Sequence, residues 1–360
     1  MTGPPPILAV GAAAIDEWYA VSNLPEPDGG AFASEVTTAF GGVGANVSVA
    51  LDRLGREVGL VTRVGDDEYG RRAREYLADT GVDAAHVSVA DDASTRSLIL
   101  SDPAGERAIV TAGESFRNLR LDEADREALA ATEAVFVTGY APDAVSRAVL
   151  DVAASAADPP ALVFDLSGSV EELVGRGTEP ETIHRFLHAA DLFVADNVAA
   201  AAYFGGAEAA RERVAAAQRA QDGDRSALTG DGWPRAVLTH GAEGMTVVAG
   251  GAVTEFDAFD VEVVDATGAG DSFVAGLIDR WVAGRGAGSG SGDSGAGSSD
   301  EGDDAGSSDE GDDADSSDDG VAAGVRFAAA VAAINCTSRF AQPGVPSREE
   351  AEAFLAERGR

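Results

Sequence analysis

Short apolar runs alternate with helix-length amphipathic segments along most of the chain. The runs with the length and β-rich composition of buried strands cover residues 7–16, 59–65, 134–140, 161–167, 192–197 and 236–241. Residues 41–55 open with a glycine turn and place Leu51 and Leu54 on one helical face. Residues 66–81 have the pattern of a charged amphipathic helix. This alternation predicts an α/β fold, a doubly wound, mostly parallel sheet flanked by helices.

Two stretches follow a different pattern, in which polar and apolar residues alternate at period two. Residues 17–40 are rich in turn formers, and residues 86–111 carry the turn sequence DPAG. We expect both stretches to form a small antiparallel β flap beside the open edge of the main sheet. A length of 360 residues suits a single domain, 1–360, with this flap as its lid.

Residues 286–320 form an acidic, low-complexity insert. They contain 12 acidic residues and no basic ones, and the sequence AGSSDEGDD occurs twice in tandem, at 296–304 and 305–313. A segment of this composition cannot bury a core, so we expect it to be disordered. It separates two apolar helical patterns, at 271–284 and 321–340, which we expect to pack side by side.

The charge balance is extreme and excludes several kinds of chemistry. The formal net charge is −36, and all 26 basic residues are arginine. Such an acid-rich composition is typical of halophilic proteins that work in near-saturated salt, whereas a GC-rich genome would explain the arginines but not the carboxylates. It argues against nucleic acid or an anionic membrane as a partner. Without lysine, any phosphate must be handled by arginine, metal ions or backbone amides.

Other residue types narrow the compartment and the cofactors. The single cysteine, Cys336, cannot form an internal disulfide, which favours a cytoplasmic protein. The N-terminal apolar run has no basic flank and is cut short by Asp16, so it is expected to be a core strand rather than a signal peptide. The four histidines are scattered, which argues against a transition-metal site.

The stretch DATGAGDSF, late in the chain, carries the strongest candidate chemistry. It follows the apolar run 261–265, an expected strand, and leads into a helical pattern. Its glycines let the amides of Gly268, Ala269 and Gly270 approach an anion at the helix N-terminus. Asp271 would repel that anion, but it could take a proton from an attacking hydroxyl. On this stretch alone, a tight strand-to-helix connection with an N-terminal helix acid remains an alternative.

Several motifs together resemble the PfkB, or ribokinase-like, family of sugar kinases. DATGAGDSF resembles the family signature D-T-x-G-A-G-D-x-F, and GGVGANVSVALDRLG resembles its earlier glycine turn that opens a helix. VTRVGDDEYG, AVLTHGAEG and the ending that contains FAQPGVP resemble further family elements. The matches occur in the family's order across nearly the whole chain, apart from the acidic insert.

The resemblance implies a ribokinase-like fold and transfer of the γ-phosphate of ATP, with Mg²⁺, to a sugar hydroxyl under the flap. By the matching motif positions, the resemblance implies a general base at Asp271 and oxyanion amides at Gly268, Ala269 and Gly270. It implies sugar contacts at Asp16, Gly42 and Asn46, and a monovalent cation such as K⁺ at Asp265 and Thr267. The implied ATP contacts are Asn197, Thr239, Gly241, Gly244, Gly268 and Gly270. Asp16, at the predicted end of the first strand, would accept hydroxyl protons at the cleft. Asn46 could instead be a helix N-cap.

The chain departs from the family pattern at several positions. Ala200 stands where many members carry the glutamate of N-x-x-E, which organises the Mg²⁺ shell, and Val43 stands where ribokinases carry lysine. Phe340 and Gly344 replace a glycine and a serine near the C-terminus, which puts the complete monovalent-cation site in doubt. Asp196 or another acid is a substitute candidate for the missing glutamate.

The first signature and the ribokinase-like ending favour ribose or another pentose as the acceptor. The alternatives are a phosphorylated sugar (ribose 1-phosphate or a fructose phosphate), a nucleoside, 2-keto-3-deoxygluconate, or a non-catalytic sugar and nucleotide sensor on the same fold. A phosphorylated acceptor would need at least one flap arginine in the cleft. The candidates in or near the flap are Arg63, Arg96, Arg107 and Arg117. Flaps in the family often pair between subunits, so a homodimer is expected through this element.

Overall fold

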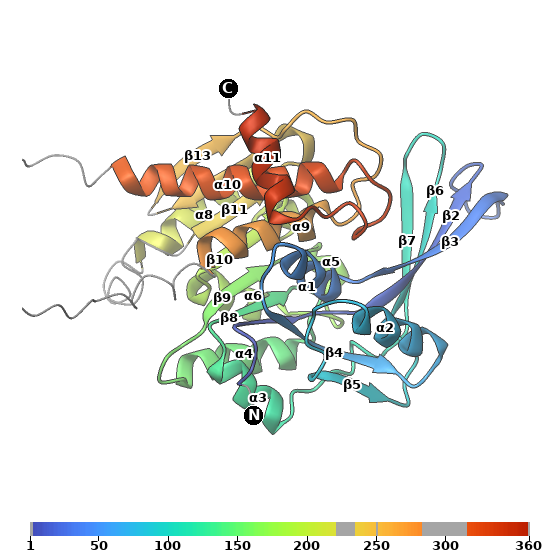
Figure 1. The fold of residues 1–360 in the computed structure, drawn as a ribbon, viewed down its shortest axis with the longest axis horizontal. Coiled ribbons are helices and arrows are strands. Elements are labelled where there is room, and N and C mark those ends of the chain that lie inside the picture. The colour runs from blue at the N-terminus through green and yellow to red at the C-terminus, as the bar shows by residue number, and fades with distance from the viewer. Residues whose placement is uncertain (1–2, 221–234, 250, 283–314, 359–360) are drawn as a thin grey trace, which may run out of the picture.

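The computed structural model describes residues 3–220, 235–249, 251–282 and 315–358. Its centre is a nine-stranded sheet (Figure 1). In spatial order the strands are β13 (Ala252–Phe256), β12 (Met245–Ala249), β11 (Arg235–Thr239), β10 (Leu192–Asp196), β9 (Ala161–Asp165), β8 (Ala134–Thr138), β1 (Ile7–Val10), β4 (Val58–Gly65) and β5 (Val87–Ala90). Neighbours from β11 to β5 are parallel, and β12 and β13 add an antiparallel edge. The predicted doubly wound sheet is confirmed.

Helices cover both faces of this sheet because each inner strand is apolar on both sides. In β1, Ile7 and Ala9 belong to one buried cluster and Leu8 and Val10 to the other. The first face is covered by α1 (Val43–Arg53), α2 (Glu68–Ala78), α9 (Ala269–Leu277) and α10 (Asp315–Asn335), with α11 (Arg348–Arg358) outside α10. The second face is covered by α3 (Glu123–Ala131), α4 (Asp143–Ser155), α5 (Val170–Leu173), α6 (Pro180–Ala189), α7 (Asn197–Phe204) and α8 (Ala207–Ala220).

A separate four-stranded sheet forms the lid (Figure 1). Its strands, in spatial order, are β3 (Ala33–Gly41), β2 (Ala14–Val21), β6 (Arg96–Ser101) and β7 (Arg107–Ala112). The β2–β3 and β6–β7 pairs are antiparallel, and β2 pairs with β6 in parallel. Both stretches of period-two alternation contribute strands to it. Residues 87–90 of the second stretch differ, because they pair with β4 as an edge of the large sheet.

The apolar run 7–16 is divided between the two sheets, so its prediction as one strand is wrong. The core strand ends at Val10, and the lid strand begins at Ala14. Between them Gly11 lies against Gly44 at the start of α1, where a Cβ on Gly11 would stand 2.5 Å from Gly44 Cα. This close approach turns the chain out of the core. Asp16 is therefore a lid residue and not the end of the first core strand.

Two other expectations change near the C-terminus. Residues 261–265 form no strand, because the amides of Val264 and Asp265 donate to the carbonyl of Cys336 at 2.8 and 3.2 Å. Of the predicted insert 286–320, residues up to 314 lie outside the described residues, and residues 315–320 begin α10. In the described ranges no helix is both long and apolar enough to cross a membrane.

The two helices that flank the insert pack against each other as predicted. Gly276 of α9 lies so close to α10 that an added Cβ would stand 2.6 Å from Ala328 Cα. A π-helical segment, Ile278–Val282, continues α9, and its Trp281 is buried in the same cluster as Val325. The start of α9 and the end of α10 lie together, since Nδ2 of Asn335, the last residue of α10, donates to Thr267 O just before α9 at 3.3 Å.

Candidate active site

The site lies where the strand order of the large sheet reverses. From β1 the chain continues on one side to β4, and it later returns to the other side at β8. Helices diverge at such a point and leave a crevice at the carboxyl ends of the strands. Three elements meet there: β2 of the lid carries Asp16, α1 carries Asn46, and α9 carries Asp271.

Asn46 and Asp271 are in direct contact although 225 positions separate them. Asn46 Nδ2 donates to Asp271 Oδ2 at 2.7 Å, and Gln342 Nε2 donates to Asn46 Oδ1 at 2.8 Å. The second bond fixes the orientation of the Asn46 amide, so its NH₂ group faces the carboxylate. Asn46 is therefore a partner of Asp271, and no side-chain cap bond is present at the start of α1. The sequence analysis did not single out Gln342, whose only signal was its place in FAQPGVP.

Both carboxyl groups at the site are hard to ionise. Burial raises the pKa of Asp271 to about 6, and the negative charge of Asp16 also raises it, whereas a hydrogen bond from Asn46 lowers it. Burial likewise raises the pKa of Asp16 to about 6, and a hydrogen bond from Ser97 lowers it. A buried carboxylate with this pKa is ionised at neutral pH and is a better proton acceptor than an exposed one.

The two glycines before α1 make room for the Asp16 side chain and for the turn. A Cβ on Gly41 would stand 2.1 Å from Asp16 Oδ2. Gly42 has φ of 94°, and a Cβ there would stand 2.5 Å from the carbonyl oxygen of Ala12. Only glycine fits both positions without moving the lid strand or the start of α1.

The turn at the start of α9 presents free backbone amides. Gly268 has the left-handed φ of 73° and is the N-cap of α9. Among the described residues the amides of Gly268, Gly270 and Asp271 have no hydrogen-bond partner, whereas the amide of Ala269 donates to Ala266 O at 3.2 Å. A Cβ added to Gly270 would meet nothing within 4 Å, so space is open beside this turn. Such a turn can bind an anionic oxygen.

The residues assigned to ATP come together through a histidine that the sequence analysis missed. Asn197 begins α7, and Thr239, Gly241 and Gly244 follow at the end of β11. His240 lies between them, with Nδ1 2.6 Å from Asn197 Oδ1 and Nε2 2.8 Å from Thr246 Oγ1. Burial lowers the pKa of His240, so the neutral ring meets both partners by donating from one nitrogen and accepting at the other.

Ala200, which stands in place of the family's glutamate, is a core residue of α7. Its side chain is 1% exposed, and Asp196 is committed to capping α7 by accepting from Ala199 N at 2.7 Å. A different acid lies nearby, the partly buried Asp165 at the end of β9. Burial, together with the charges of Asp271 and Asp196, raises the pKa of Asp165 to about 7. Within the described ranges no group of three or more His, Cys, Asp or Glu side chains is arranged to hold a metal ion.

Asp265 and Thr267, the pair assigned to a monovalent cation, form a compact turn before α9. Asp265 Oδ1 accepts from Thr267 N at 2.9 Å and from Thr267 Oγ1 at 2.7 Å, and its Oδ2 accepts from Phe340 N at 2.8 Å. Phe340 has a left-handed φ of 69°. Arg107 of the lid also donates to this turn, with Nη1 3.3 Å from Asp265 Oδ1.

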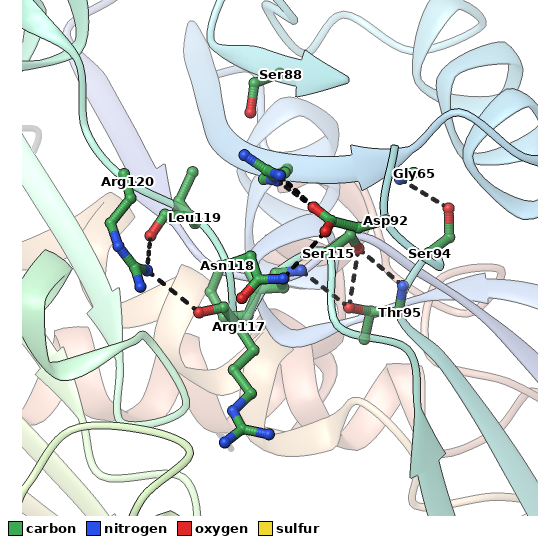
Figure 2. A network of polar contacts seen from close by, with 12 residues as sticks. Gly65, Ser88, Asp92, Ser94, Thr95, Ser115, Arg117, Asn118, Leu119 and Arg120 are labelled. Atoms are coloured by element: carbon green, nitrogen blue, oxygen red, sulfur yellow. Dashed lines mark hydrogen bonds and ion pairs between the residues drawn. The ribbon is translucent and has the colours of Figure 1, made fainter. Parts of the chain in front are cut away.

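The other flap arginines have separate partners. Arg63 pairs with Asp92, which also accepts from Asn118 Nδ2 at 3.1 Å (Figure 2). Arg96 donates to Tyr69 at 2.8 Å. Arg117 lines a cavity of about 390 Å³ beside the start of α4. The cavity's other basic residues are Arg120 and Arg176, and its acidic ones are Glu114 and Asp143.

At this edge of the open doubly wound sheet, a turn of unpaired amides at a helix N-terminus lies beside a partly buried carboxylate. Residues 5–348 match the pfkB family of carbohydrate kinases, and the chain belongs to that family. It is thus a phosphotransferase that acts on a sugar hydroxyl.

Relatives of known activity differ in their acceptors. An ATP-dependent ribose-1-phosphate kinase from Halopiger xanaduensis is 27% identical over 282 residues, which cover 77% of this chain and 84% of that protein. A fructokinase from Escherichia coli is 30% identical over 265 residues, covering 72% and 80%. The ribokinase of Arabidopsis thaliana, solved with ribose and ATP, superposes with a TM-score of 0.72 at 20% identity over 98% of this chain and 99% of that one. The last comparison concerns the fold.

Proposed function

We propose that this chain is an ATP-dependent kinase that transfers the γ-phosphate of ATP to a hydroxyl of a small sugar, ribose or another pentose. The contact between Asn46 and Asp271, beside the open turn of α9, is the observation that carries the proposal. It brings together a group that can hydrogen-bond a sugar, a partly buried carboxylate that can act as a base, and a turn that can bind an anion. The glycine turn before α1 and the ribokinase-like C-terminus favour a pentose.

The proposed reaction begins with the sugar bound under the lid. Asp16 and Asn46 hold hydroxyl groups, and Asp271 Oδ takes the proton of the hydroxyl that attacks the γ-phosphorus. As that oxygen forms its bond to phosphorus, the bond to the β-phosphate oxygen breaks and ADP leaves. The free amides of Gly268, Gly270 and Asp271 stabilise the negative charge that develops.

Mg²⁺ fits this arrangement as an ion held mainly by phosphates and water, and it would supply positive charge to the transferring group. Asp165, at the end of β9, is the candidate carboxylate beside it, because burial and the charges of Asp271 and Asp196 raise its pKa and a cation would offset both. Asn197 and the turn after β11 would contact the nucleotide.

A phosphorylated sugar is a second candidate acceptor, favoured by the arginine-lined cavity. The cavity lies beside Gly139, the residue that follows β8. Its lining residue Gly177 precedes Thr178, whose amide donates to Gly139 O at 2.8 Å. Gly139 lies at the same edge of the sheet as the proposed sugar site. Arg117 and Arg176 could there pair with a phosphate dianion. The relationship to a ribose-1-phosphate kinase agrees with this candidate.

A panel assay tests the function and separates the two candidates. ADP formation from MgATP is measured with ribose, other pentoses, fructose, ribose 1-phosphate, fructose phosphates, nucleosides and 2-keto-3-deoxygluconate, each with the wild type and Asp271→Asn. Turnover of an unphosphorylated pentose that is lost in the variant supports the first candidate. Turnover of ribose 1-phosphate alone, with a KM raised by Arg176→Ala, supports the second. Nucleotide binding without turnover of any acceptor would favour a sensor.

A further inference from the structure

One arginine of the lid is bound to the turn that precedes the free amides of α9. Arg107, the first residue of β7, donates from Nη1 to Asp265 Oδ1 at 3.3 Å and also to Thr267 Oγ1. These partners are 158 and 160 positions away in sequence. The Asp265 side chain is 11% exposed and that of Arg107 is 32% exposed, so the carboxylate is the more shielded member of the ion pair. The lid is therefore connected directly to the phosphate-binding turn.

This contact conflicts with the expected monovalent-cation site. Oxygens of both residues assigned to the cation already accept from protein donors: Asp265 Oδ1 from Thr267, Asp265 Oδ2 from Phe340 N, and Thr267 O from Asn335 Nδ2. Asp265 also faces the guanidinium of Arg107. A potassium ion on the same oxygens would be repelled by that group at close range. The residues present here do not fit a monovalent cation while the lid contact is made.

We propose that the Arg107 guanidinium takes the place of the monovalent cation. The inference rests on the kinase function proposed above. Guanidinium is always charged, so it can neutralise Asp265, and its N–H groups can hold the carboxylate and the Thr267 hydroxyl in fixed directions. Arg107 is a positioning residue: it acts through Asp265 and Thr267 on the turn that carries Gly268.

The consequence is a link between two events that are otherwise independent. Arg107 reaches the turn from the lid, so the positive charge arrives only when the lid is down. Closing the lid over the acceptor and completing the site for the γ-phosphate become one step. The kinase should then be indifferent to which monovalent cation is in solution.

A second lid contact provides a matched control. Arg339, in the loop after α10, pairs with Glu35 of the lid strand β3 at 3.2 Å, and both side chains are about half exposed. It also joins the lid to the core near Phe340, but it does not contact Asp265. Arg339→Ala thus removes a lid contact without removing the charge beside the turn. If Arg107 only held the lid against the core, Arg107→Ala and Arg339→Ala would respond to salt in the same way.

The test compares wild type, Arg107→Ala, Arg107→Lys and Arg339→Ala in equal molar concentrations of KCl, NaCl and tetramethylammonium chloride. Turnover with the best acceptor, KM for ATP and melting temperature are measured in each salt. We expect the wild type and Arg339→Ala to keep the same turnover in all three salts. Arg107→Ala should lose about tenfold or more in tetramethylammonium, in line with removal of a charge-stabilising group. KCl or low millimolar methylguanidinium should restore much of this loss, and Arg107→Lys should lose less.

Nucleotide affinity gives a readout that does not depend on knowing the acceptor. The Kd for MgADP, measured by calorimetry in the same salts, should become dependent on K⁺ only in Arg107→Ala. If no sugar is phosphorylated but this pattern appears, the proposed function fails and the role of Arg107 stands. If the wild type itself requires K⁺, or if Arg107→Ala and Arg339→Ala respond alike to every salt, the proposal is overturned. Melting temperatures identify any variant that is unfolded, for which Arg107→Lys replaces Arg107→Ala in the comparison.

Discussion

At the scale of single residues, the site depends on one carboxylate held between a donor and a second carboxylate. Asn46 donates to Asp271, and the nearby charge of Asp16 opposes its ionisation. The donor keeps Asp271 directed at the crevice, and burial keeps it basic. Both effects come from residues far apart in sequence, so the chemistry exists only in the folded chain.

Replacing Asp271 by Asn should abolish most of the activity while leaving the fold intact. The amide has the same shape but cannot accept the hydroxyl proton, so we expect kcat to fall by about 10²–10⁴-fold. KM for ATP should change much less, because the amides of the turn remain. The measurement is steady-state ADP formation, with melting temperature as the control. A variant that keeps a tenth of wild-type turnover would contradict the role of Asp271 as general base.

The pH dependence of kcat/KM should report the raised pKa of this group. As the proposed general base Asp271 must be ionised, and its pKa in the folded protein is about 6. Activity should therefore be flat above neutral pH and should fall as the pH drops through about 6, by up to tenfold per unit below it. An unperturbed aspartate would hold its activity down to about pH 4. A profile that stays flat to pH 5 would show that Asp271 is not the titrating base.

At the scale of elements, the start of α9 has different requirements at its two glycines. Gly268 has φ of 73°, and a Cβ there would stand 2.6 Å from Ala341 Cβ and 2.7 Å from its Cα. Gly270 has no neighbour within 4 Å of an added Cβ. The first glycine is needed by the fold, and the second borders open space, where the proposed function puts the phosphate.

Alanine at these two positions should separate stability from binding. Gly268→Ala is strained and meets backbone, so we expect a lower melting temperature and loss of activity. Gly270→Ala should keep the wild-type melting temperature, but its methyl group enters the open space and should weaken MgATP binding. Calorimetric unfolding and nucleotide titration of both variants check this. Equal effects of the two substitutions on stability would contradict the geometry.

Asp279, a buried aspartate in the segment that continues α9, forms ion pairs at the end of this helix away from the candidate site. Asp279, in the π-helical segment after α9, has a side chain that is 0% exposed and pairs with Arg56 at 2.6 Å and with Arg348 at 2.9 Å. The two arginines come from the region after α1 and from α11. One carboxylate therefore connects three separate segments.

Asp279→Asn should destabilise the fold without changing the chemistry. The substitution removes the buried charge and leaves Arg56 and Arg348, which are 28% and 31% exposed, so the loss of their charged hydrogen bonds should cost about 1.5–3 kcal/mol. The exposed pair of Asp151 with Arg185 is the control, since Asp151→Asn should cost about 1 kcal/mol or less. Urea unfolding measures both free energies. If the two variants lose similar stability, the Asp279 cluster does not hold these segments together.

The sequence predicts where the strands and helices lie along the chain better than which sheet each strand joins. The period of the apolar residues placed the core strands, and the motif at residues 265–273 placed the turn and Asp271. The run 7–16 was predicted as one strand, because no local pattern reveals that Gly11 meets Gly44. Gln342 and His240 were missed because their roles come from contacts across long sequence separations. Asp165 was missed because its strong pKa shift arises from burial, which periodicity alone does not measure.

At the scale of the whole molecule, the main feature is the large excess of acidic residues, some of which lie at the candidate site. The net charge is −36, and three carboxyls with raised pKa values, Asp16, Asp165 and Asp271, lie at the candidate site. Repulsion among surface acids is screened by salt. Segments that only add charge should therefore affect stability and its salt dependence more than catalysis.

Deleting residues 286–314 should leave the kinase reaction unchanged. The deletion removes nine carboxylates, and the chain leaves and rejoins the described fold at the ends of α9's extension and α10 that lie away from Thr267. We expect kcat and KM within about twofold of wild type and a lower salt concentration for half-maximal stability. A neutral Gly/Ser insert of equal length separates the effect of charge from that of length. Loss of activity in the deletion but not in the neutral insert would contradict this view.

The division of residues 7–21 between two sheets also bears on how this enzyme can evolve. Only Gly11, Ala12 and Ala13 separate the core strand β1 from the lid strand β2, and β1 lies between β4 and β8 in the middle of the large sheet. Recombination between related genes at this boundary would join one parent's central strand to the other's lid. The lid itself comes from two separate stretches, β2–β3 and β6–β7, so exchange of the whole lid needs crossovers at both.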